Sequence, residues 1–188
     1  GGSLMKKLKS RIQDKYNLSN YQIAQLSFVY KSLSSEISKI IIMGILFHNH
    51  LDLYTFLLFV MCLLRTFSGG LHFYTYIRCL AASTIYIGII IFILSKIVLL
   101  LYMQLLLLTA CIIVCYVTGP VLSKYRIAFP KKQLYFSRNI TCLIIFLYTI
   151  LMYIIPKNPY FIAGVWMVIL HSLQLIVAKI TKKGDSIQ

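Results

Sequence analysis

A histidine and a cysteine, His72 and Cys79, lie seven positions apart in RTFSGGLHFYTYIRC (residues 65–79), a stretch between two apolar runs. A cysteine is the strongest side-chain nucleophile near neutral pH, and a histidine is well suited to take its proton. On one straight helix, residues seven apart are separated by about 10 Å along the axis, which is beyond hydrogen-bond reach. If the two act together, the chain between them cannot be one regular helix, and Gly69-Gly70 would let it change direction.

The same stretch also has a purely structural interpretation. Arg65 and Arg78 could anchor two helix ends at the membrane boundary, with Gly69-Gly70 forming the turn between them. Ionisable residues near membrane depth are costly, however, and are functional candidates for that reason. The combination of thiol, imidazole and glycines favours an active site, at which attack of the thiol on a peptide carbonyl would form an acyl thioester.

The elements that position this stretch are membrane helices. The chain has 188 residues, of which 60% are hydrophobic, whereas a soluble domain averages nearer half. The composition predicts an all-α, polytopic membrane bundle of about six membrane helices. The apolar runs lie at about 37–47, 53–64, 79–95, 97–119, 140–155 and 160–178. The first two are shorter than the roughly 20 residues of a full span, so flanking residues must extend them or they insert only partly.

The N-terminal part of the chain precedes the first apolar run. Gly1 to Leu4 come before Met5 and are interpreted as a remnant added ahead of the native start. Residues 5–188 are then expected to form a single integral-membrane domain. A basic amphipathic segment leads into it, and residues 18–33 either lie at the membrane interface or open the first long helix.

The charge distribution predicts orientation. With 19 basic and 4 acidic residues, the formal charge is +15, which in a soluble protein would suggest nucleic acid. Here the basic residues are dispersed between apolar runs, so we expect no nucleic-acid partner. If all six runs cross with the N-terminus inside, only Lys96 and Lys157 fall outside, in agreement with the positive-inside rule. This places both termini and the stretch 65–79 on the cytoplasmic side of a bacterial cell membrane, where thiols stay reduced.

Several other residue patterns favour structural roles. The five cysteines lie in or beside apolar runs and form no disulfide framework, and Cys111 and Cys115 are predicted packing residues on one helix face. The motif HNHLD (48–52) has metal-like ligand types but no apparent fourth ligand, so a polar outer turn is favoured. His171 is expected to pack or hydrogen-bond between helices. We expect no metal and no cofactor.

The motif in residues 65–79 resembles that of a known protein family. Arg65, Gly69, Gly70, His72 and Cys79, in this order and spacing, resemble the signature of the AgrB family, the membrane cysteine endopeptidases of accessory gene regulator quorum sensing. The likeness extends over most of the chain, through its length, its basic amphipathic N-terminus and a basic loop after a Gly-Pro turn. An acidic residue before the first apolar run adds to it.

The resemblance implies specific roles. Cys79 would be the nucleophile and His72 its general base. Four residues would support them: Arg65, Gly69, Gly70 and Glu36. The implied substrate is an AgrD-type precursor peptide, cut between its central signal segment and its C-terminal tail. A substrate thiol could displace the enzyme thiol from the acyl thioester, which would close a thiolactone without ATP.

Some alternatives remain open in the sequence. Glu36 could orient His72 or pair with Arg65, or it could be an interface acid that interacts with Lys39. A small transporter or peptide-export component would use the polar residues to line a path, and its function would survive Cys79→Ser. A zinc hydrolase would be inhibited by chelators and not by thiol alkylation. Membrane lipids are expected partners, and association into a homodimer is left open.

Overall fold

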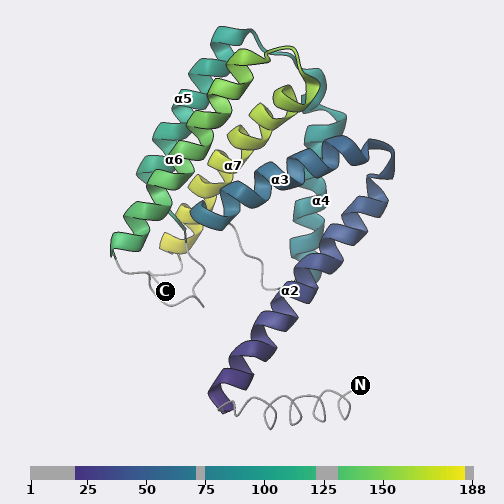
Figure 1. The fold of residues 1–188 in the computed structure, drawn as a ribbon, viewed down its shortest axis with the longest axis vertical. Helices are drawn as coiled ribbons and strands as arrows, with labels where there is room; N and C mark the ends of the chain where they lie inside the picture. Colours follow the sequence, from purple (N-terminus) through teal and green to yellow (C-terminus); the bar gives the residue numbers. More distant parts are fainter. Residues whose placement is uncertain (1–19, 71–74, 122–130, 185–188) are drawn as a thin grey trace. The chain divides into compact units, whose positions relative to one another are not determined.

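The computed structural model describes residues 20–70, 75–121 and 131–184, and these ranges are helical apart from turns and one isolated bridge (Figure 1). The predicted all-α architecture is confirmed, with six α-helices in the described ranges. They are α2 (Asn20–Leu46), α3 (Leu51–Ser68), α4 (Tyr76–Phe92), α5 (Leu101–Thr118), α6 (Lys131–Ile154) and α7 (Pro159–Gly184). Two short 3-10 helices, η1 (His48–His50) and η2 (Leu94–Lys96), lie between them.

Five helical segments in the described part are long and apolar enough to cross a membrane. They are 48–68, 76–96, 101–118, 132–154 and 159–181. The second apolar run is extended by its flanking residues, since η1 leads directly into α3 and the two give 21 residues. The first apolar run instead forms the C-terminal part of α2, whose earlier turns are amphipathic.

Helix α2 belongs to a separate compact unit, which ends at Leu46, and the elements from Phe47 onward form the other. The expectation that the amphipathic segment opens the first long helix is confirmed for residues 20–33, because α2 begins at Asn20. Within α2, Lys39 Nζ lies 2.6 Å from Glu36 Oε1 at a spacing of three residues. This is the pairing expected of an acid and a base on one helix face.

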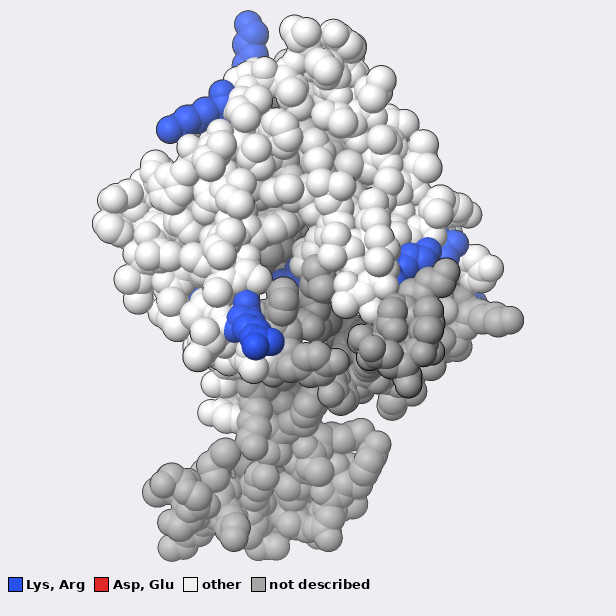
Figure 2. Space-filling view, turned by 180° about the vertical axis from the view of Figure 1, so that it is seen from behind, with Lys and Arg blue, Asp and Glu red and all other residues white. Residues whose placement is uncertain are grey.

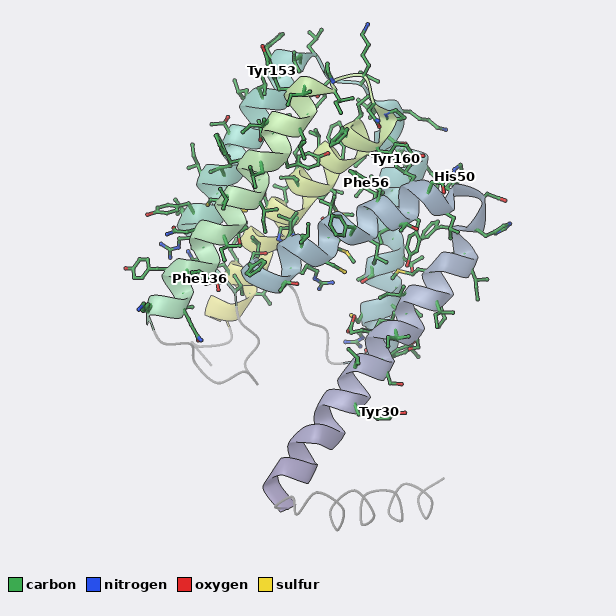
Figure 3. The ribbon with its side chains drawn as sticks, in the orientation of Figure 1. Tyr30, His50, Phe56, Phe136, Tyr153 and Tyr160 are labelled. Carbon is green, nitrogen blue, oxygen red and sulfur yellow. The ribbon has the colours of Figure 1, made fainter. Side chains whose placement is uncertain are left out.

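Helix α7 is the central element of the second unit. Its candidate span is 56% buried, against 17–33% in the other four, because α7 packs on α3, α4, α5 and α6. Aromatic contacts fix the α3 side of this packing: the Phe56 ring lies 5.9 Å from that of Tyr160 and 5.8 Å from that of Phe161 (Figure 3). The outer faces expose large apolar side chains, as a lipid-facing bundle requires.

The basic residues of this unit gather where several helix ends meet. Gly69, just after α3, forms a bridge with Val121, just after α5. Arg138 of α6 packs against Gly119, and Lys179 of α7 donates from Nζ to the Val117 carbonyl at 3.0 Å.

Two other lysines lie in turns at the opposite ends of these helices, Lys96 in η2 and Lys157 between α6 and α7. A broad surface without charged side chains separates basic residues at its edges (Figure 2). This arrangement agrees with the positive-inside rule as applied to the sequence, which set Lys96 and Lys157 apart from the other basic residues.

Candidate active site

Cys79 lies in the first turn of α4. Thr75 is extended, with φ −106° and ψ 139°, and α4 begins at Tyr76. The Cys79 N–H donates to the Thr75 carbonyl at 3.1 Å. The extended residue means that no regular helix continues through position 75, as a working pair of His72 and Cys79 would require. His72 itself lies outside the described residues. The first turn of a helix favours negative charge, so it is a favourable position for a thiolate that forms during a reaction.

The Cys79 side chain opens onto a small cavity between α3, α4 and α7. Its volume is about 170 Å³, which is many times what one water molecule needs. The lining combines one thiol with a guanidinium, an amide and two hydroxyls. The lining residues are Met61, Arg65, Cys79, Ala82, Ser83, Tyr86 and Gln174. Two of the residues singled out in the sequence, Arg65 and Cys79, therefore face one space although they lie on different helices.

The Gly69-Gly70 turn lies beside this cavity. Gly69 has φ +74° and ends α3 by donating its N–H to the Arg65 carbonyl at 3.1 Å. Gly70 has φ +153°, so both residues adopt backbone conformations that side chains disfavour. A Cβ on Gly70 would lie 3.5 Å from Arg65 Nε and 3.8 Å from Gln174 Nε2. The bare backbone at Gly70 thus leaves room for both the guanidinium and the amide beside it.

Backbone and side-chain hydrogen bonds hold this turn in place. The Val121 N–H donates to the Ser68 carbonyl at 3.0 Å, which ties the end of α3 to the segment after α5. The Ser68 hydroxyl lies 2.6 Å from His171 Nε2 and donates to the Leu64 carbonyl at 2.6 Å. Because a hydroxyl has one proton, this second bond makes Ser68 the acceptor of an Nε2–H from His171. The prediction that His171 hydrogen-bonds between helices is confirmed.

The two arginines of the stretch have different environments. Arg65 is half-buried and lines the cavity. Arg78 is exposed on the first turn of α4, as expected for a residue that anchors a helix end. Only one of the two therefore contributes to the candidate site.

Other predicted positions are not among the residues that line the cavity. Glu36 is exposed and pairs with Lys39, which is one of the two arrangements considered for it. Cys111 and Cys115 are buried in α5, and Cys115 Sγ lies 3.5 Å from Ser172 Oγ, so they pack as predicted. None of the five cysteines, all of which are described, is in a disulfide.

The HNHLD motif forms the turn that was expected. Residues 48–50 are η1, and Asp52 is in the first turn of α3. The His50 ring lies 5.6 Å from the Phe92 ring in an edge-on contact (Figure 3). Among the described residues no group of three or more histidine, cysteine and acidic side chains could hold a metal ion.

Three polar lining residues, Ser83, Tyr86 and Gln174, were not identified in the sequence, and neither were the apolar Met61 and Ala82. Ser83 and Tyr86 follow Cys79 by four and seven positions, so helical periodicity alone places them on its face of α4. Tyr86 donates its hydroxyl to the Met167 carbonyl at 3.2 Å, which connects α4 to α7. Gln174 follows His171 by three positions on α7. Its polar side chain within an apolar run was the sequence signal that could have identified it.

The fold and this cavity define a polytopic membrane protein with a thiol site between three of its helices. The family model for accessory gene regulator B matches residues 4–176, which is most of the chain. The chain therefore belongs to the AgrB family, whose members are membrane cysteine endopeptidases that process the AgrD propeptide to form an autoinducing peptide. Comparisons with curated proteins and with solved structures gave no match.

Proposed function

We propose that Cys79 is the nucleophile with which this chain cleaves its AgrD propeptide, and that His72 is the base that takes the thiol proton. The observation that carries this proposal is the shared cavity, in which Cys79 faces Arg65 beside the Gly70 backbone. Arg65 and Cys79 lie on two different helices, α3 and α4, so their place on one cavity depends on how these helices pack as well as on their nearness in the sequence.

The proposed reaction has two steps. Cys79 Sγ forms a bond to the carbonyl carbon of the scissile peptide, and its proton moves to His72. The C–N bond then breaks, the leaving amine takes that proton, and the N-terminal fragment remains as a thioester on Cys79. In the second step a substrate thiol attacks the thioester carbonyl, the bond to Cys79 breaks, and the proton of the substrate thiol returns to Cys79. One thioester replaces another, so the thiolactone closes without an energy source.

The supporting residues act through position and charge. Arg65 supplies a fixed positive charge at the cavity, where negative charge develops on the substrate. Gly69 and Gly70 form the turn after α3, and the bare backbone at Gly70 leaves room for the Arg65 side chain beside it. The family resemblance assigns Glu36 a supporting role as well, and within α2 its Oε1 lies 2.6 Å from Lys39 Nζ.

The site is proposed to face the cytoplasm. Cys79 is in the first turn of α4, and Gly69, after α3, bridges to Val121 near Arg138 and the end of α7. The positive-inside rule assigns this basic end to the cytoplasm of a bacterial cell. The propeptide would then be cut on the side where it is synthesised.

The experiment uses the purified protein in lipid vesicles with its AgrD-type peptide. Mass spectrometry is expected to find the N-terminal peptide fragment attached to Cys79, and Cys79→Ala or His72→Ala to abolish cleavage. The matched control is Cys62→Ala, which removes an exposed thiol on α3 outside the cavity lining and should cleave normally. Cleavage by Cys79→Ala at the unsubstituted rate would overturn the proposal.

A further inference from the structure

We propose that the side-chain amide of Gln174 is a catalytic hydrogen-bond donor, which binds the substrate carbonyl oxygen while Cys79 attacks the adjacent carbon. This inference rests on the proposed function of Cys79 and adds the group that stabilises the anion formed in its reaction. Gln174 is on α7, 95 positions after Cys79 in the chain, and both residues line the same cavity.

The position of the amide nitrogen is set by its neighbours. Gln174 Nε2 and Arg65 Nε both lie against Gly70, within 3.8 Å of the place where a Cβ would stand. Two kinds of N–H donor, one charged and one neutral, therefore converge beside one glycine. Arg65 and Gln174 both also line the cavity that holds the thiol.

The amide is available for a substrate. In the described part of the chain Gln174 makes no hydrogen bond, although it is half-buried in an apolar helix. The other glutamine of the helical core, Gln104, donates its Nε2 to the Leu99 carbonyl at 2.8 Å. The Tyr86 hydroxyl on the cavity wall is likewise committed to Met167. A polar group in apolar surroundings is stabilised when it gains a hydrogen-bond partner, and Gln174 lines the cavity in which a substrate carbonyl would lie next to Cys79.

Attack of a thiolate on a peptide carbonyl is favoured by an N–H donor beside the carbonyl oxygen. When a thiolate adds to a peptide carbonyl, the oxygen takes on negative charge, and fixed N–H donors stabilise it without reorganisation. Such a donor acts more strongly on the transition state than on the bound peptide, because charge is greatest there. Loss of Gln174 should therefore slow acylation and leave peptide binding nearly unchanged.

The test compares variants of Gln174 in lipid vesicles with the AgrD-type peptide. Gln174→Met keeps the length of the side chain and removes the donor, and Gln174→Glu keeps its shape and replaces the NH₂ group with oxygen. Single-turnover formation of the Cys79 adduct should slow by about 100-fold or more in both variants. The peptide concentration at half-maximal rate should stay within about threefold of that of the unsubstituted protein, because Gln174 is expected to contribute little to binding of the uncleaved peptide.

Two controls separate this role from a structural one. Leu173→Met changes the neighbouring residue on the exposed face of α7 and should form the adduct at the unsubstituted rate. Alkylation of Cys79 by iodoacetamide needs no carbonyl anion, so its rate should be the same in all four proteins.

The results distinguish a failure of the role proposed for Gln174 from a failure of Cys79 as the nucleophile. If Gln174→Met forms the adduct at the unsubstituted rate, or if acylation and alkylation fall together, the role of Gln174 is overturned. If the unsubstituted protein forms no adduct on Cys79, the proposed nucleophile fails, and the role of Gln174 fails with it.

Discussion

Substitution of Gly69 by alanine tests whether the turn after α3 holds the candidate site together. Gly69 has φ +74° and ψ −142°, a conformation that is essentially restricted to glycine and costs other residues about 1–3 kcal/mol. A Cβ would also meet the Val121 carbonyl across the bridge, so the segment after α5 must move. For a chain of this size, about 1 kcal/mol corresponds to roughly 2–4 °C, so Gly69→Ala should lower Tm by roughly 2–12 °C.

The assay is thermal unfolding in detergent, paired with the rate of Cys79 adduct formation in vesicles. Gly88→Ala is the matched control, because Gly88 is inside α4 and a Cβ there would make ordinary contacts of 3.6 and 3.7 Å with the Phe47 ring. This control should raise stability by roughly 0.5–1 kcal/mol, as alanine is preferred to glycine within a helix. Gly69→Ala should also slow the adduct, because the displaced turn includes Gly70. Equal Tm and equal rates for the two variants would refute the reasoning.

Three further substitutions test the packing around the site. His171→Ala removes the partner of the buried Ser68 hydroxyl and should reduce the free energy of unfolding by about 1–3 kcal/mol in denaturant titration, whereas an unchanged midpoint would exclude a role for this pair. Gly164→Ala places a Cβ against the Tyr148 hydroxyl, which donates to the α7 backbone at 2.6 Å, so a loss of about 1–3 kcal/mol is expected in the same titration. Arg138→Lys replaces a guanidinium that lies 5.2 and 5.5 Å from two tyrosine rings, and a decrease of about 0.5–1 kcal/mol is expected, with no decrease if the rings are incidental neighbours.

Helix positions could be predicted because apolar run length is a local property. The run predicted at 97–119 contains α5, and the run predicted at 79–95 begins three residues after the start of α4. Gly119, with φ +63°, ends α5, and Pro159 begins α7, in agreement with the preference for glycine at helix ends and proline at helix starts. Such signals act within a few residues, so they can be recognised in the sequence without knowledge of the fold.

The cavity could be predicted only in part. Cys79 and Arg65 belong to one short stretch, and the types of these residues indicated chemistry before their positions were known. Gln174 is distant in sequence, and its approach depends on how α7 packs against α3 and α4. Helix packing angles are set by side-chain surfaces along whole helices, which a periodic pattern in one helix does not specify. The continuity of residues 20–33 with the first apolar run in α2 was one of two alternatives that the sequence left open, because no residue marks a break between them.

Because Gln174 comes from the last helix, the cavity is finished late in translation. The ribosome makes Cys79 well before Gln174, and at roughly 5–20 residues per second the delay is on the order of ten seconds. During that interval a nascent chain already has the thiol but not the wall that α7 supplies. A chain truncated before α7 would keep Cys79 and the cavity walls from α3 and α4 but lack Gln174, so under the proposed role of this amide it would acylate its own thiol slowly.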